Sequence, residues 1–255
     1  MGVHVPLVTL SVDLELEIEQ QRPGAERQLE QTTAELIGVF DRHRAAATWA
    51  VADPAISAAM HQIRRSQLPH EVAIQGDRSW VGHGAGRTRF ARELTRRVLS
   101  ARAAGIPVST LALKNADLGE HLDLLVKSGI SVVRGGQVAA DANGRQSRML
   151  RFGVWEAPVS ARLPEVARWS WSAGLWSAKR LVRQAMKKNL ATHLSIDASR
   201  LMGPDTARLV TIEKFLKFAA RLRDQGRLQI APLRALAGDG SSSVGRPMQS
   251  ILRAA

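Results

Sequence analysis

The chain has 255 residues, 45% of them hydrophobic and 23% charged, so it can bury a sizeable core and does not belong to the disordered class. It contains no cysteine, which excludes disulfides, thiolate metal sites and cysteine nucleophiles. The first residues show no basic stretch followed by a long apolar run, so neither a signal peptide nor a membrane span is predicted. We therefore expect a cytoplasmic protein, whose oligomeric state the sequence leaves open.

The formal net charge of +13 is concentrated in two stretches. Residues 78–102 and residues 162–188 each hold seven Lys or Arg and a single glutamate. Each stretch is predicted to form one helix with its flanks, so its charge can be an ordinary solvated face. The alternative is a site for an anionic polymer such as a nucleic acid, which Trp169, Trp171 and Trp176 beside the cations of the second stretch favour.

Strands and helices are predicted to alternate along the chain. The run 5–12 is apolar and β-branched and stops at a carboxylate, as a buried parallel strand does, and Leu29, Leu36, Ile37 and Phe40 then recur at helical spacing. Further strands are predicted over residues 45–51, 71–75, 108–113, 130–133, 152–156, 190–196 and 228–230. Further helices are predicted over residues 88–104, 118–128, 172–188 and 206–224, with a helix start at Asp53-Pro54, a hairpin at 141–144 and a helix stop at Gly226.

About seven strands that alternate with helices predict an α/β fold with a mainly parallel sheet, either open or closed into a barrel. No Gly-x-Gly-x-x-Gly follows the first strand, so a dinucleotide-binding fold lacks its main signal. We predict a single barrel domain over residues 1–237. Residues 238–255 have the Gly and Ser content of a flexible C-terminal tail.

Polar residues follow the predicted strands, where a barrel of alternating strands and helices places its reactive groups. These strand-end residues are Asp13 and Glu15, Gln75 and Asp77, Lys114 and Asn115, Trp155 and Glu156, and His193 and Asp197. Carboxylates, an imidazole and an amine that converge on one mouth can supply a base, an acid and an electrostatic stabiliser. The set is typical of a hydrolase.

The order of these segments resembles the polysaccharide deacetylases of the NodB-homology type, over residues 8–236. Residues 9–15 (TLSVDLE) are similar to the family's first motif, and residues 69–80 (PHEVAIQGDRSW) to its second, a His-Glu-Ile-Gly-x-His-x-x-x-His run. Residues 109–115 (STLALKN) resemble the third motif and residues 192–197 (THLSID) the last. The segments 129–135, 153–160 and 219–229 also fit the family's order.

The resemblance implies a deformed (β/α)7 barrel that removes acetyl groups from an acetylated oligo- or polysaccharide, breaking a C–N bond where the group is an amide. It implies Asp13 as the base, Glu15 as a metal ligand and His193 as the general acid. The cofactor that it implies is a divalent metal, zinc or cobalt.

Three further residues are expected to contact the sugar. The resemblance makes residues 153–160 a strand that lines the sugar groove, with Trp155 in it. Trp80 can stack on a sugar ring as well, and Asn115 ends the third motif. Packing under a loop is the alternative for both tryptophans.

Two departures from the family pattern concern the metal. Gln75 and Ser79 stand where the second motif has its metal-binding histidines. An amide oxygen and a neutral hydroxyl are weak ligands to zinc or cobalt, which leaves Glu15 as the only strong one. Lys114 replaces the third motif's arginine, keeping its charge but not its planar fork.

Four interpretations stay open. A metal shell rebuilt from Glu15 with His70, Asp77 or His83 would give an active deacetylase. A metal-free hydrolase would use Asp13 as base and His193 as acid, with Lys114 facing the developing charge. A barrel that has lost catalysis would be a glycan-binding or regulatory protein, which the missing histidines favour. The fourth is a nucleic-acid or anionic-polymer binder built on the two basic helices.

Overall fold

The computed structural model describes residues 5–16, 23–82, 84–119, 121–139, 146–163, 171–203 and 207–238. Its strands are β1 (Leu7–Asp13), β2 (Thr48–Val51), β3 (Glu71–Gly76), β4 (Val108–Leu113), β5 (Val132–Val138), β6 (Arg148–Met149), β7 (Trp155–Val159), β8 (Ala161–Leu163), β9 (Thr192–Asp197) and β10 (Gln229–Ala231). Its α-helices are α1 (Ala25–Arg42), α2 (Ala59–Arg65), α3 (Arg87–Ala103), α4 (Leu122–Lys127), α5 (Trp171–Lys188), α6 (Ala207–Asp224) and α7 (Ala235–Gly238).

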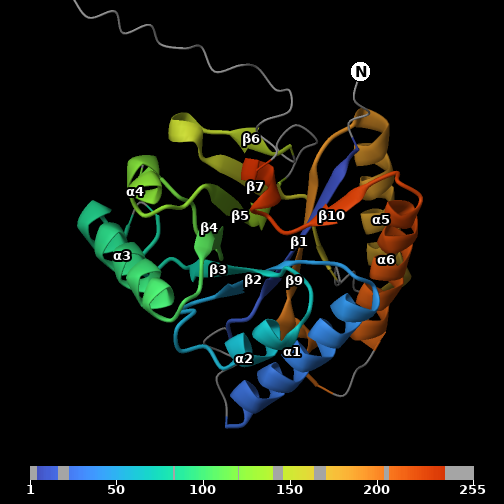
Figure 1. Cartoon of the computed structure of the whole chain (residues 1–255), viewed down its shortest axis with the longest axis horizontal. Helices are drawn as coiled ribbons and strands as arrows, with labels where there is room; N and C mark the ends of the chain where they lie inside the picture. The colour runs from blue at the N-terminus through green and yellow to red at the C-terminus, as the bar shows by residue number, and fades with distance from the viewer. Residues whose placement is uncertain are drawn as a thin grey trace, which may run out of the picture.

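The described strands form one sheet in the order β6-β7-β5-β4-β3-β2-β1-β9-β8, with β10 paired to β1. Every pair is parallel except that of β6 with β7. The sheet is curled, and helices cover its outer side (Figure 1). The predicted α/β fold is thereby confirmed as a single curled sheet with the character of a partial barrel.

The segment from β7 to β8 lies between the two edges of this curl. β7 pairs with β5, whereas β8 pairs with β9, and between them the Ser160 N–H donates to the His193 carbonyl at 2.8 Å. Elsewhere in the sheet, one edge of β1 pairs with two strands: its first half pairs with β10 and its second half with β2. These two irregularities deform the sheet relative to a regular barrel.

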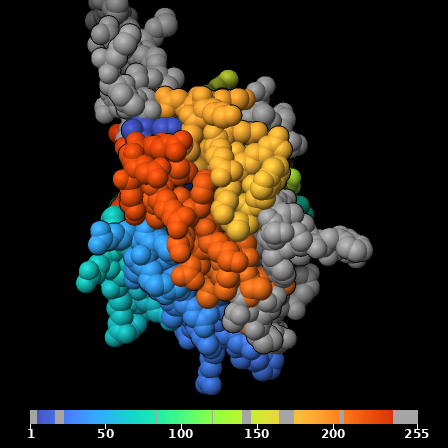
Figure 2. Space-filling view, turned by 90° about the vertical axis from the view of Figure 1, so that its right-hand side faces the viewer, coloured from blue at the N-terminus to red at the C-terminus, as the bar shows by residue number. Residues whose placement is uncertain are grey.

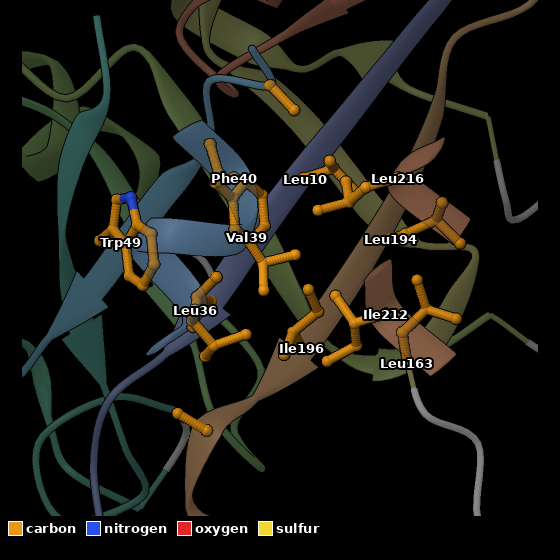
Figure 3. Close-up of a cluster of buried hydrophobic side chains, with 14 of the residues drawn as sticks. Leu10, Leu36, Val39, Phe40, Trp49, Leu163, Leu194, Ile196, Ile212 and Leu216 are labelled. Atoms are coloured by element: carbon orange, nitrogen blue, oxygen red, sulfur yellow. The ribbon is translucent and has the colours of Figure 1, made fainter. Parts of the chain in front are cut away.

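The largest core lies between the outer side of the sheet and the helices. Figure 3 shows Leu36, Val39 and Phe40 of α1 and Ile212 and Leu216 of α6 against apolar side chains of β1 and β9. The spacing of three and four residues along α1 puts its apolar side chains on one face, as the sequence predicts. Each such side chain contributes about 1.5–3 kcal/mol when fully buried.

The inner side of the sheet is polar along β1 and β9. Since alternate residues of a strand point to opposite sides, β1 places Leu10 and Val12 in the outer core and Ser11 on the other side. Ser195 of β9 reaches the same interior, because it lies opposite Ser11 in the parallel pairing. A parallel strand with an apolar layer on each face would be apolar at every position. The alternation of apolar and polar residues along β1 therefore indicates that the inner side of the sheet is polar.

Several predicted boundaries change. The helix expected at Asp53 begins only at Ala59, because the Asp53 carboxylate accepts from Ala55 N and its carbonyl from Ser57 N, which forms a turn. β8 is too short to be predicted. Gly226 ends α6 as expected, with a φ of 68°. The predicted hairpin at 141–144 and residues 239–255 of the predicted tail lie outside the described residues.

Candidate active site at the barrel mouth

The carboxyl ends of β1, β4, β5 and β9 meet around a small cavity. Asp13 ends β1 and lies opposite Asp197 at the end of β9. Lys114 follows β4 and lies in the same wall. The cavity measures about 10 Å³, so it has room for about one water molecule. The structure therefore brings Asp13 and Lys114 together, in a space far smaller than a sugar.

Arg134 of β5 fills the interior beneath this cavity. Its Nη1 donates to Asp13 Oδ1 at 2.6 Å, to Ser11 Oγ at 3.1 Å and to Ser195 Oγ at 3.2 Å. Its Nη2 donates to the Leu113 carbonyl at 2.7 Å. Both charged side chains are buried, and such a pair tolerates burial only because it is closely paired and hydrogen-bonded. Asp13 is thus held by a cation instead of facing an open space.

His193 lies deeper in the interior than Asp13. Its Nδ1 is 3.0 Å from Thr9 Oγ1 and its Nε2 is 3.1 Å from Ser11 Oγ. In the parallel pairing His193 lies opposite Thr9, four residues before Asp13, which is about 13 Å along a strand. The structure therefore places Asp197, not His193, at the mouth beside Asp13.

The surroundings of His193 also disfavour its charged form. Burial lowers its pKa to about 3, and the nearby Arg134 guanidinium acts in the same direction. An imidazole that is neutral at pH 7 and enclosed by two hydroxyls lacks the acidic proton with which an imidazolium would protonate a departing amine at the mouth. We therefore withdraw the role of general acid for His193.

Glu15 and Lys114 meet at the rim. Lys114 Nζ donates to the Glu15 carbonyl at 2.9 Å, and Glu15 Oε1 accepts from Ala52 N at 2.5 Å. Burial raises the pKa of Glu15, and the Ala52 N–H and Lys114 oppose this rise. A raised pKa works against a metal ligand, which must be deprotonated.

The other positions that the family uses for a metal do not supply strong ligands. Gln75 is buried, and its Oε1 has no hydrogen-bond partner in the structure. Ser79 is exposed, and its N–H donates to Asp77 Oδ1 at 2.7 Å. Among the described residues, no group of three or more His, Cys, Asp or Glu is arranged to hold a metal ion. The residues present therefore do not fit the divalent metal that the resemblance implies.

His70 cannot rebuild that site. It precedes β3 at the amino end of the sheet, where its Nδ1 accepts from Ala47 N at 3.1 Å and its ring lies edge-on to Trp49. Burial lowers its pKa. The mouth lies at the opposite end of the strands, so the expectation of His70 as a ligand is wrong. His83 is outside the described residues.

The three predicted sugar contacts separate in space. Trp80 is buried and stacked on Phe90, with 5.8 Å between the ring centres, and the Arg97 guanidinium lies 4.6 Å from its ring centre. Trp155 begins β7 and packs against a buried cluster that includes Leu233. Both tryptophans are packing residues, and Asn115 alone of the three lines the mouth cavity.

Sequence reasoning missed Arg134, the residue that organises the interior. The signal was an arginine directly after the apolar run 130–133, where the predicted strand stopped five residues before the end of β5. It also missed Arg162, whose Nη2 donates to the Gly136 carbonyl at 2.8 Å beside the mouth. A charged residue that directly follows a strand predicted to be buried should have been taken as part of a site.

Glu71 closes the amino end of the interior. Its Oε2 accepts from Thr48 Oγ1 at 2.7 Å and from Arg234 N at 2.8 Å, and its Oε1 accepts from Thr110 Oγ1 at 2.5 Å. Thr48 Oγ1 in turn accepts from Leu233 N at 2.8 Å. This carboxylate ties the chain after β10 to three strands, and its role is structural.

No protein-family model and no curated protein matches the sequence. Among solved structures, the fold is similar to a protein of Mycobacterium smegmatis provisionally assigned as a polysaccharide deacetylase, with a TM-score of 0.71 and 16% identity over 96% of this chain and 95% of that one. It is also similar to the 4-alpha-glucanotransferase of Thermococcus litoralis, with a TM-score of 0.63 and 11% identity over 93% of this chain and 41% of that one. A GH57-type branching enzyme of Pyrococcus horikoshii has a TM-score of 0.62 and 8% identity over 95% of this chain and 71% of that one. At these identities the likeness shows a polysaccharide-deacetylase-like α/β fold and nothing finer.

Within the part of the chain that the structure describes, no helix combines the length and the apolar character that crossing a membrane requires.

Proposed function

We propose that this protein is a saccharide-binding barrel of the polysaccharide deacetylase type that has lost metal-assisted hydrolysis. The observation that carries the proposal is a mouth with room for about one water, at which the described residues include no group of His, Cys, Asp or Glu that could hold a metal ion. Gln75 and Ser79 at the expected metal positions support it. The proposal assumes that the curled sheet is a form of the seven-stranded barrel of that family.

The groups at the mouth that could serve amide hydrolysis are engaged with other partners. A base has to reach the attacking water, and a cation or several N–H donors have to face the oxyanion. Here the Asp13 carboxylate already accepts from Arg134, and Lys114 is engaged with the Glu15 carbonyl. A substrate carbonyl would have to displace one of these contacts to enter the mouth.

A larger hollow beside the mouth is the proposed place for the sugar. It measures about 930 Å³, which lies in the range of ligand sites, and it adjoins the ends of β1 and β2. Glu15, Glu30 and Asp53 lie in its wall together with Leu14 and Leu29. Carboxylates can accept hydrogen bonds from sugar hydroxyls, and aliphatic side chains can contact the ring faces. The names of two structural neighbours concern a polysaccharide and a glucan, which agrees with a saccharide ligand.

The test combines an activity assay with a binding assay. Acetate release from a fully N-acetylated chito-oligosaccharide is measured with added Zn²⁺ or Co²⁺, and binding of the same sugar is measured by calorimetry. We expect binding without acetate release, and weaker binding in Glu30→Gln. Glu35→Gln is the matched control, because this exposed residue lies on the same helix but not in the wall of the hollow. Metal-dependent acetate release would refute the loss of hydrolysis, and equal binding by both variants would refute the site.

A further inference from the structure

The two basic stretches of the sequence have different surroundings. On α3, Arg87 pairs with Asp123 at 2.5 Å, Arg96 with Asp53 at 3.0 Å and Arg97 with Glu93 at 2.6 Å. α5 contains no Asp or Glu, and none of its cations has an ion pair with a described acid. The charge of α3 is therefore partly compensated by neighbouring carboxylates, whereas no described carboxylate compensates that of α5.

α6 extends the uncompensated charge of α5. The two helices lie side by side on the right of the molecule in Figure 1, and Figure 2 faces this side. Lys179 Nζ and the Arg183 guanidinium of α5 lie 5.4 Å and 5.3 Å from the ring centre of Phe218 on α6. These contacts fix the register of the two helices. They also bring the exposed faces of both helices together.

Six exposed cations define what we call the α5–α6 face. They are Arg180, Arg183 and Lys187 on α5 and Lys214, Lys217 and Arg221 on α6. Within each helix the spacing of three and four residues puts the cations in one row. Packed helix axes are about 8–10 Å apart, so the two rows form a compact positive surface. No described acid lies within ion-pair distance of any of the six.

An exposed aromatic ring completes the row on α5. Trp176 is 59% exposed, and the Arg180 guanidinium lies 5.4 Å from its ring centre. It lies one turn before Arg180, on the same side of the helix as the other cations of that row. A large exposed indole costs solvation free energy, so it is typical of a binding surface.

We propose that the α5–α6 face binds single-stranded nucleic acid. The two rows of cations would contact successive phosphates, and Trp176 would stack on a base, which is how sequence-tolerant single-strand sites are built. Both helices lie flat against the sheet, so neither projects as a helix must to enter the major groove of a duplex. Among the side chains of these two helices that the structure describes, Trp176 and Val210 are the exposed large apolar ones, which is less apolar surface than insertion into a membrane requires.

Fluorescence anisotropy with a labelled 30-mer of deoxythymidine tests the proposal on the full chain. Six phosphate contacts on a single strand predict a slope of log K against log salt of about −4. The triple variant Arg180→Gln/Arg183→Gln/Lys187→Gln should lower the affinity on the order of a hundredfold at 0.1 M salt and bring the slope to about −2. Trp176→Ala should weaken binding about fivefold or more with little change in slope.

The matched control is the triple variant Arg89→Gln/Arg92→Gln/Arg102→Gln on α3. It removes the same three charges from exposed positions elsewhere, so it should retain nearly all of the affinity. Equal losses in both triple variants would show a nonspecific effect of net charge and overturn the proposal. Tighter binding of a 30-base-pair duplex, of heparin or of phosphatidylserine vesicles, unchanged by Trp176→Ala, would also overturn it. The result does not depend on the mouth, so it is separable from the saccharide proposal.

Discussion

The guanidinium of Arg134 and the carboxylate of Asp13 meet at 2.6 Å inside the sheet, at the residue to which the resemblance gives the role of base. Two hydroxyls, Ser11 Oγ and Ser195 Oγ, accept from the same Nη1. A buried charge that loses its partner is much more costly than an exposed one, because water cannot replace the lost interaction. The loss of one member should therefore destabilise the interior more than the loss of both.

Removal of the cation should strongly destabilise the fold. Arg134→Met is expected to lower the free energy of unfolding by about 3–5 kcal/mol, because it leaves Asp13 buried and unpaired. Urea denaturation followed by circular dichroism measures this change. The control is Arg148→Met, whose arginine pairs with Glu156 at the same distance of 2.6 Å but at the surface, and which should cost no more than about 1 kcal/mol.

A double variant separates the charge effect from packing. Asp13→Asn in the Arg134→Met background removes the orphan carboxylate, so it should recover part of the lost stability. If Asp13→Asn lowers the free energy of unfolding as much in that background as in the wild-type protein, the two side chains are not coupled, and their pairing does not contribute to stability.

Restoring the two missing imidazoles should restore metal binding. Gln75→His/Ser79→His puts nitrogen donors at the two positions where the resemblance expects them to bind a metal together with Glu15, so Co²⁺ should bind about tenfold or more tightly than to the wild-type protein. The visible absorption of Co²⁺ reports both affinity and geometry. Ser79→His alone is the control, because one added imidazole leaves Glu15 with a single strong partner. Tight Co²⁺ binding by the wild-type protein would contradict the conclusion that its residues do not fit a divalent metal.

Periodicity and strand order were enough to predict most of the fold. β4 was predicted to the residue, and α1 followed from apolar spacing, because a surface helix must bury one stripe. The sequence does not show at which level of the sheet each residue of a strand lies. His193 was placed at the mouth, yet β9 begins only one residue before it, so the side chain lies at the level of Thr9.

The site was predicted only in part for a similar reason. Asp13 and Lys114 were found because they directly follow apolar strands. Trp80 also follows a strand, β3, and was therefore predicted to stack on a sugar ring. In the structure it stacks on Phe90 instead. The local sequence does not show which side of a loop is covered by other side chains. Arg134 follows an apolar strand as well, and it was passed over because its strand was predicted to end at residue 133.

The neutral His193 should make the protein less stable as the pH falls. Its pKa is lowered from 6.5 to about 3 in the folded state, so below pH 6.5 the unfolded chain binds a proton that the folded chain does not. Stability contributed by this residue is complete above pH 6.5 and is lost progressively between pH 6.5 and about 3, with a slope of up to about 1.4 kcal/mol per pH unit.

NMR titration and denaturation at several pH values test this prediction. The His193 ring signals should keep their neutral shifts down to pH 5, and His193→Gln should unfold with a smaller loss of stability between pH 7 and pH 5. A ring that titrates near pH 6.5 in the folded protein would show that the imidazole is open to solvent, contrary to the enclosure by Thr9 and Ser11.

Glu71 should control how firmly the C-terminal part of the fold is attached. Glu71→Gln replaces an acceptor oxygen by an NH₂ group that faces the Thr110 hydroxyl or the Arg234 N–H, so the loss should be about 1–3 kcal/mol of unfolding free energy. Amide hydrogen exchange at Leu233 and Arg234 should accelerate more than exchange in α1. Thr110→Val is the control, because it removes one donor and leaves the contact with Arg234 intact. Equal acceleration of exchange in α1 would mean that the carboxylate supports the whole sheet and not this attachment.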